Sequence, residues 1–453
     1  MLNLRLSEIA VWTRGHLAGA DVAVHGVATD TRTLRGGELF VALKGERVDA
    51  HDFLGAAAAA GAAAALVARK VDASLPQVVV ADTGRALGDL AAAVRTRRDA
   101  RVIGITGSNG KTTVKTLTAS ILARRGATHW TQGNLNNEIG LPLTLLALPE
   151  DTRYAVLEMG AGKPGDIAYL AAIARPEVAL VNNVAPAHLE RMRSLAGVAQ
   201  TKGALYEALP DDGIAVINGE DAFAALFTGL AGARRMLRFG FSSSFDVWAD
   251  ELRLGTRSQF RLHTPQGETA VDLPLAGRHN VSNALAAAAI AVALDVPLDD
   301  IRQGLENAEA VAGRLARRET AAGWTLIDDS YNANPGSAAA AIDTLVLLPG
   351  EPWLVLGDMK ELGADAAVLH ADIGARARAA GVRRLYATGD LSRAAVQAFG
   401  DGGRHFAAQA ELIEALRADL HAGVCCLVKG SRSSAMDRVV KALLGAQGDS
   451  HAA

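Results

Sequence analysis

Cysteine is nearly missing from this chain: among 453 residues only Cys425 and Cys426 occur, side by side in the apolar run AGVCCLV. Adjacent cysteines rarely meet the geometry of a mutual disulfide, and no second pair exists to complete a zinc site. We therefore expect two buried strand residues in the reducing cytoplasm.

An excess of either charge is also lacking, since 46 Lys and Arg stand against 49 Asp and Glu. This balance argues against a whole-protein basic surface for nucleic acid or anionic lipid. The one long uncharged stretch, residues 53–68, is mostly alanine and glycine and falls short of a membrane span, so we predict a packed helix there. At the N-terminus Arg5, Ser7 and Glu8 interrupt the apolar residues, which argues against a secretory signal.

Half of the residues are hydrophobic and 21% are charged, which is typical of a globular protein, and the length suggests about three domains. A turn and an apolar strand in GELFVALKG, then the strand LPQVVVAD, form a first α/β unit, and residues 83–101 are predicted to be helical. Strands in ARVIGIT, TRYAVLEMG, PEVALVNNV and GIAVING alternate with helix-length segments, which predicts a mostly parallel sheet covered on both faces.

Alternating residues over 237–275 predict antiparallel strands. Beyond residue 313, strands in WTLIDDS, PWLVLGD, RRLYATGD and VCCLVKGS are each followed by helical sequence, which predicts a doubly wound α/β domain. The expected division is residues 1–83, 84–312 and 313–453.

The segment GITGSNGKTT, residues 104–113, lies between an apolar strand and a helix start, and we call it the phosphate loop. Its glycines would let backbone N–H groups approach phosphate oxygens, and the helix N-terminus adds its positive dipole end. Lys111 would reach the terminal phosphates and the Thr112 hydroxyl would help to hold Mg²⁺. The pattern is GxxGxxGKT instead of the strict GxxxxGK[ST], and it predicts ATP or GTP binding; a glycine-rich surface turn is the alternative.

A magnesium nucleotide needs carboxylates, and Glu158 at the end of the strand AVLEMG is a candidate metal ligand. His188 and Lys202 follow at the sheet edge or on a helix. By pattern alone, His188 fits a packed histidine and Lys202 a solvated lysine at least as well as a site residue.

Longer motifs add a resemblance that spans nearly the whole chain. They are TDTR at residues 29–32, GELFVALKG, DAHDF, GITGSNGKTT, GNLNNEIGLPLTLL, LEMGA, NNVAPAHLE, SLAGVAQTKG, GRHNVSNALAA, GRL, IDDSYNANP, LGDMKELG and VKGSRS. In this order the chain resembles the Mur ligases. The resemblance implies a three-domain α/β architecture, with a phosphate-loop (P-loop) domain around a central parallel sheet and a Rossmann-like C-terminal domain.

The activity that the resemblance implies is ATP-dependent amide formation. D-alanyl-D-alanine would be joined to UDP-N-acetylmuramoyl-tripeptide through an acyl phosphate, with ATP and Mg²⁺, in the supply of peptidoglycan precursors. A DNPR-type motif, which the diaminopimelate-adding relatives carry, is replaced here by ATGDLSRAA, and this favours the dipeptide as acceptor amine. We expect a cytoplasmic monomer that binds these small molecules and no nucleic acid.

The resemblance also implies individual roles. The catalytic set would be Lys111, Glu158, His188, Lys202 and Arg314, with Thr112, Glu158, His188 and Lys202 near the metal and Lys202 carbamylated in related ligases. Nucleotide binding would use Gly107, Ser108, Asn109, Gly110, Lys111, Thr112, Thr113, Asn137, His279, Asn280, Asn283, Arg314 and Asp329. Substrate binding would use Thr29, Asp30, Thr31, Arg32, Lys44, Gly45, Asn134, Asn136, Tyr331, Asn332 and Asn334.

Two other functions stay open at this point. A ligase of the same fold could add a single amino acid such as diaminopimelate, lysine or glutamate. A nucleotide-dependent scaffold could keep the phosphate loop without turnover, although a pure binding protein has no need of Lys111, Glu158, His188, Lys202 and Asp329 together.

Overall fold

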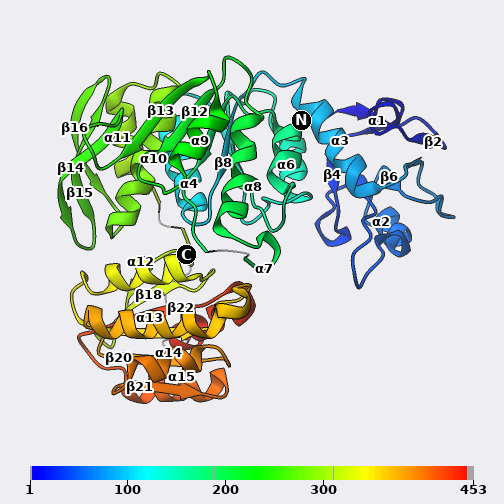
Figure 1. Ribbon diagram of the computed structural model, residues 1–453. Coiled ribbons are helices and arrows are strands. Elements are labelled where there is room, and N and C mark those ends of the chain that lie inside the picture. Colours follow the sequence, from blue (N-terminus) through cyan, green and yellow to red (C-terminus); the bar gives the residue numbers. More distant parts are fainter. Residues whose placement is uncertain (1–2, 187–188, 310, 446–453) are drawn as a thin grey trace.

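The computed structural model describes residues 3–186, 189–309 and 311–445, which fold around three larger sheets (Figure 1). The first region lies to the side of the central one in this view, and the third region lies below it. The first sheet has five strands in the order β2-β7-β6-β5-β4, beside a small antiparallel pair of β1 and β3. Its elements are β1 (Leu4–Arg5), α1 (Leu6–Trp12), β2 (His16–Ala18), β3 (Ala23–Val24), β4 (Val27–Ala28), η1 (Thr31–Thr33), β5 (Leu39–Val41), η2 (Ala50–Phe53), α2 (Leu54–Ala59), β6 (Ala64–Val67), β7 (Gln77–Val79) and α3 (Thr83–Arg95).

Two predictions about this first region were wrong in part. Residues 53–68 do not form one helix, because Gly61 has a φ of +89° just after α2 and the rest of the run enters the sheet as β6. β6 is fully buried between β5 and β7, and a short uncharged run fits a buried strand as well as a helix. The helix predicted over 83–101 ends at Arg95, and residue 101 begins the next strand.

The second sheet has nine strands in the order β16-β15-β14-β13-β12-β11-β8-β10-β9, parallel from β9 to β14 and antiparallel beyond. This confirms the parallel sheet, but β13 pairs in parallel with both neighbours, so the antiparallel part is shorter than predicted. The elements are β8 (Arg101–Thr106), α4 (Lys111–Ala123), β9 (Thr128–Trp130), α5 (Gly140–Leu146), β10 (Tyr154–Glu158), α6 (Asp166–Ala174), β11 (Val178–Val181), α7 (Leu189–Met192), α8 (Leu195–Glu207), β12 (Ile214–Asn218), α9 (Ala224–Ala231), β13 (Arg235–Gly240), β14 (Val247–Leu254), β15 (Ser258–Thr264), β16 (Gly267–Leu273), α10 (Arg278–Ala293) and α11 (Leu298–Glu306).

Helices cover both faces of this sheet because its central strands are apolar on both sides. Ile103 and Ile105 of β8 pack toward α4, α10 and α11, whereas Val102 belongs to the core shared with α5, α6, α8 and α9. That second core continues through α3 into the first region. The carboxyl ends of the parallel strands thus stay free for loops.

The third sheet, with the order β17-β18-β22-β19-β20-β21, lies below the central one in Figure 1. Five of its strands are parallel, and four of them, β18, β19, β20 and β22, were predicted. The fifth, the outer strand β21, and the antiparallel edge strand β17 were not foreseen. Cys425 and Cys426 are buried in β22 as free thiols. The elements are β17 (Ala316–Glu319), β18 (Thr325–Asp329), α12 (Pro335–Leu345), β19 (Glu351–Gly357), η3 (Gly363–Asp365), α13 (Ala366–Ala380), β20 (Arg384–Thr388), α14 (Ser392–Phe399), β21 (Gly403–Phe406), α15 (Gln409–Asp419), β22 (Val424–Lys429), η4 (Arg432–Ser434) and α16 (Asp437–Gly445).

Across the part of the chain that the structure describes, none of the helices combines the length and the apolar character that crossing a bilayer demands.

Candidate active site

The phosphate loop joins β8 to the N-terminus of α4 at the carboxyl edge of the central sheet, as predicted. Gly107 and Gly110 have φ angles of +147° and +78°, which favour glycine. A Cβ on Gly110 would lie 2.3 Å from the Asn283 Oδ1 atom, so the close approach of α10 also requires glycine here. The loop is therefore tightly packed against α10.

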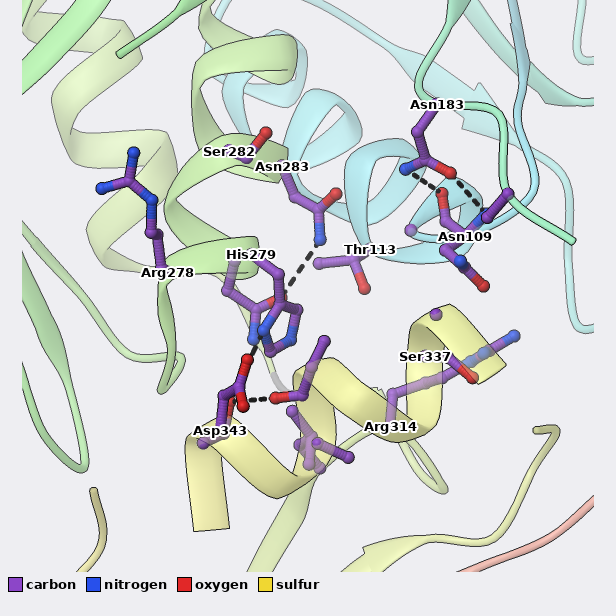
Figure 2. Close-up of a pocket in the computed structure, with 18 of the residues that line it drawn as sticks. Asn109, Thr113, Asn183, Arg278, His279, Ser282, Asn283, Arg314, Ser337 and Asp343 are labelled. Carbon is purple, nitrogen blue, oxygen red and sulfur yellow. Dashed lines mark hydrogen bonds between the residues drawn. The ribbon is translucent and has the colours of Figure 1, made fainter. Parts of the chain in front are cut away.

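Two asparagines directly after β11, which were not predicted as site residues, hold the loop. The Asn183 Oδ1 atom accepts from the Asn109 backbone N–H at 2.9 Å, and the Asn183 side-chain amide donates to the Asn109 carbonyl at 3.1 Å (Figure 2). The Asn182 side-chain amide donates to the same carbonyl at 3.0 Å. Both asparagines follow a strand that neighbours β8, which is the signal that could have identified them. Asn182 also donates to Asn283 at 2.9 Å and so links the loop to α10.

Two cavities meet at the phosphate loop. The larger, about 490 Å³, lies between the central and C-terminal regions, where α4, α10 and α12 face one another (Figure 2). The smaller, about 370 Å³, lies on the other side of the loop, and Arg314 lines both. Predicted residues in the larger cavity are Asn109, Gly110, Thr112, Thr113, His279, Asn280, Asn283, Arg314 and Asp329; those in the smaller are Gly107, Ser108, Lys111, Asn136, Asn137, Glu158, Lys202, Arg314, Tyr331 and Asn332.

Charge in the larger cavity centres on a buried ion pair. The Lys429 Nζ atom lies 2.5 Å from the Asp329 Oδ2 atom and also donates to the Asn332 carbonyl at 3.0 Å. Burial lowers the pKa of Lys429, and burial lowers the pKa of nearby His279 to about 4. At neutral pH His279 is therefore an uncharged ring, suited to a flat apolar ligand surface.

Two lysines converge in the smaller cavity. Lys111 donates to the carbonyls of Gly107 and Ser108 at 2.7 and 3.3 Å, and Lys202 donates to the same Gly107 carbonyl at 3.2 Å. Burial lowers the pKa of Lys111, and burial together with the Lys111 charge lowers that of Lys202 well below its ordinary value. Lys202 is 2% exposed, so the solvated lysine that its sequence pattern allowed is excluded.

Oxygen donors suited to Mg²⁺ stand beside the loop. The Thr112 hydroxyl donates to the Glu158 Oε2 atom at 2.9 Å, and the Asn136 side-chain amide donates to Oε1 at 2.7 Å. A hydroxyl and a carboxylate at a phosphate loop fit a hard cation, which takes its remaining ligands from water and phosphates. Accordingly, residues 3–186, 189–309 and 311–445 contain no cluster of three or more His, Cys, Asp or Glu able to hold a metal by themselves. His188 lies outside the described residues.

Several predicted residues occupy other places. Asn334 contacts the phosphate loop: its Nδ2 atom donates to the Asn109 Oδ1 atom at 2.7 Å. Asn137 lines the smaller cavity, and its Oδ1 atom also accepts from the Gly140 N–H at 2.9 Å. Asn134, by contrast, borders neither cavity. The described residues around the two cavities likewise do not include the first-region candidates, which are Thr29, Asp30, Thr31, Arg32, Lys44 and Gly45.

Asp30 and Arg32 form an exposed ion pair at 2.5 Å, and hydrogen bonds from Arg32 lower the pKa of Asp30 to about 2. The Arg314 Cζ atom lies 4.2 Å from the centroid of the Tyr331 ring. This contact connects the start of the C-terminal region to the loop after β18.

Comparison with known proteins settles the family. Three models match in order: the Mur ligase family catalytic domain over residues 23–95, the Mur ligase middle domain over 105–291 and the Mur ligase glutamate ligase domain over 313–432. The chain belongs to the Mur ligase family.

Similar Mur ligases match along nearly their full length. The UDP-N-acetylmuramoyl-tripeptide–D-alanyl-D-alanine ligase of Escherichia coli strain K12 is 47% identical, over 98% of this chain and 99% of that protein. A crystal structure of MurF from Acinetobacter baumannii has a TM-score of 0.93 at 37% identity, covering 98% and 99%. The MurF ligase from Thermotoga maritima in complex with ADP has a TM-score of 0.83 at 28% identity, covering 93% and 97%.

Proposed function

We propose that this Mur ligase is an ATP-dependent enzyme that adds D-alanyl-D-alanine to UDP-N-acetylmuramoyl-tripeptide, giving the UDP-pentapeptide precursor of peptidoglycan. The observation that carries the proposal is that two cavities flank one phosphate loop and share Arg314. A nucleotide in the larger cavity would direct its terminal phosphate at a carboxylate in the smaller one. The 47% identity to the Escherichia coli ligase supports the choice of substrates.

A carboxylate is a poor electrophile for an amine, so the reaction needs an activated acyl group. An oxygen of the tripeptide carboxylate attacks the γ-phosphorus of ATP, and the bond between that phosphorus and the β,γ-bridging oxygen breaks. ADP is the leaving group, and the tripeptide becomes an acyl phosphate. The amine of D-alanyl-D-alanine then attacks the acyl carbon, losing a proton as inorganic phosphate departs. Lys111 and Arg314 stabilise the negative charge that gathers on the transferring group.

The larger cavity suits the nucleotide base and ribose. His279, Asn280 and Asn283 lie on its α10 side, and Asp329 offers a carboxylate to the ribose hydroxyls. Lys429 keeps that carboxylate oriented through their 2.5 Å contact. The T. maritima relative in complex with ADP supports the use of an adenine nucleotide by this chain.

Thr112 and Glu158 would hold Mg²⁺, with His188 and Lys202 as further candidates. When bound, Mg²⁺ supplies positive charge that offsets the crowded phosphate and carboxylate oxygens. As an ammonium, Lys202 cannot ligate a cation. Its lowered pKa favours the uncharged amine, which can add CO₂ and become an anionic carbamate.

The remaining assignments complete the proposal. Tyr331, Asn332 and Asn136 line the smaller cavity and would contact the peptide substrates. Residues 29–32 and Lys44-Gly45 in the first region would receive the UDP part, Asn134 and Asn334 remain substrate candidates, and Asn137 remains a nucleotide candidate. We infer a cytoplasmic monomer divided at residues 83/84 and 312/313.

The decisive experiment is to measure phosphate release from ATP with UDP-N-acetylmuramoyl-tripeptide, with and without D-alanyl-D-alanine. We expect release only when both are present, together with a UDP-pentapeptide product, and loss of both signals in Lys111→Ala. Release with a free amino acid such as diaminopimelate or lysine would keep the family and change the substrate. ATP binding without release under any acceptor would refute the ligase function.

A further inference from the structure

Lys115 is a buried lysine that the proposed reaction does not yet use. It lies on α4 one helical turn beyond Lys111, on the same face, and 4% of its side chain is exposed. It is not among the described residues that line either of the two cavities. A lysine is almost never fully buried unless it is paired, so the protein itself must contain its partners.

Those partners lie on the strands beside the phosphate loop. The Lys115 Nζ atom donates to the Thr131 carbonyl at 2.7 Å and lies 3.8 Å from the Glu158 Oε2 atom. Thr131 directly follows β9, is fully buried, and its hydroxyl accepts from the Glu158 backbone N–H at 3.0 Å. The Lys115 ammonium therefore contacts both Thr131, which binds the Glu158 backbone, and the Glu158 carboxylate itself.

The other contacts of the carboxylate show what this arrangement achieves. Oε1 accepts from Asn136, five residues beyond Thr131, and Oε2 accepts from the Thr112 hydroxyl on α4. Lys115 joins the same two elements, α4 and the segment after β9, behind the carboxylate. It thereby fixes the direction in which the carboxylate points, toward Thr112 and the loop.

We propose that Lys115 is a positioning residue for Glu158: it aims the carboxylate at the Thr112 hydroxyl, so that a nucleotide-bound Mg²⁺ meets a preformed pair of oxygen donors. This rests on the proposed function, in which Glu158 and Thr112 serve the metal. Groups that hold a metal-binding carboxylate from behind typically change metal affinity about 10–100-fold when removed. Removing this cation also leaves a buried carboxylate without its charge partner.

Binding measurements separate positioning from folding. Calorimetric titration with ADP, in EDTA and then in MgCl₂, gives the Mg²⁺-dependent gain in affinity for the wild type, Lys115→Gln and Lys115→Met. Glutamine keeps a donor for the Thr131 carbonyl and loses the charge, whereas methionine loses both. We expect metal-free ADP affinity within about twofold of wild type, and a Mg²⁺-dependent gain reduced about tenfold or more in both variants.

Lys441→Met is the matched control, since Lys441 is an exposed helical lysine paired with Asp437 at 3.1 Å, and its loss should change neither affinity. Lys115→Arg, which keeps charge and donor, should restore most of the gain. An unchanged gain in Lys115→Gln overturns the inference, and so does a parallel loss of metal-free ADP binding or of folding in that variant. A wild type without any Mg²⁺-dependent gain or without phosphate release contradicts the proposed function instead.

Discussion

One hydrogen bond connects the phosphate loop directly to the C-terminal region, and its removal should weaken ATP binding by a calculable amount. The Asn334 Nδ2 atom donates to Asn109, while its Oδ1 atom accepts from the Ser337 N–H at 2.9 Å and caps the N-terminus of α12. Asn334→Ala removes both contacts. Asn334→Ser keeps a good capping residue but is too short to reach Asn109.

The expected magnitudes follow from these two contacts. A hydrogen bond between uncharged groups contributes about 1 kcal/mol, which corresponds to roughly a fivefold change in affinity at 25 °C. An N-cap contributes about 1 kcal/mol to stability. We therefore expect a KM for ATP raised by up to about fivefold in both variants, and a melting temperature lowered more in Asn334→Ala, which also loses the cap, than in Asn334→Ser.

A double-mutant cycle with Asn109→Ala tests whether the effect belongs to this contact. The double variant Asn109→Ala/Asn334→Ser should bind ATP no more weakly than Asn109→Ala alone, because each change removes the same bond. Steady-state kinetics with varied ATP and thermal unfolding provide both readouts. If the two single effects on KM simply added, the two side chains would act independently and the reasoning would be refuted.

Three further outcomes test the charged groups of the site. With carbon-13 bicarbonate, the protein should show a carbamate NMR resonance, because the lowered pKa of Lys202 favours the uncharged amine that reacts with CO₂. Lys202→Arg should abolish this resonance together with most of the turnover. A resonance that survives the substitution contradicts the carbamate at Lys202. In urea titrations, Lys429→Met should lower the free energy of unfolding by about 3–5 kcal/mol, because Asp329 is left buried without its partner. The double variant Lys429→Met/Asp329→Leu should recover much of that loss. If Lys429→Met left the free energy of unfolding unchanged, the pair would not be stabilising. Burial lowers the pKa of His279 to about 4, so on acidification the unfolded state takes up the proton before the folded state does. The contribution of the neutral ring to the free energy of unfolding is therefore complete above about pH 6.5 and is lost as the pH falls toward 4. Between pH 7 and pH 5, urea titrations should show a loss of unfolding free energy about 2 kcal/mol larger in the wild type than in His279→Gln, and equal losses would exclude His279 as the cause.

Local pattern was sufficient for much of the fold and for the centre of the site. The strand, glycine loop and helix around Lys111 are consecutive in the chain, so their order alone predicted the phosphate loop. Residue patterns also predicted the parallel sheets and the burial of Cys425 and Cys426, because strand periodicity and apolar runs are local properties. Where local cues were ambiguous, prediction failed: in residues 53–68, pairing with β5 and β7 decided for a strand.

Only the tertiary structure decided which distant side chains meet. Lys115 looks like an ordinary helical lysine in the sequence, yet packing of α4 against β9 and β10 places it beside Glu158. Lys429 and Asp329 are 100 residues apart in the chain, and the pairing of β18 with β22 brings them together. Asn109 and Asn334 are 225 residues apart, and the packing of the C-terminal region against the central one brings them together. The sequence by itself determined the elements and the phosphate loop, because those depend on neighbouring residues. The hydrogen-bond partners, the burial of the lysines and the two cavities depend on how whole helices and strands pack together. No local residue pattern contains that information.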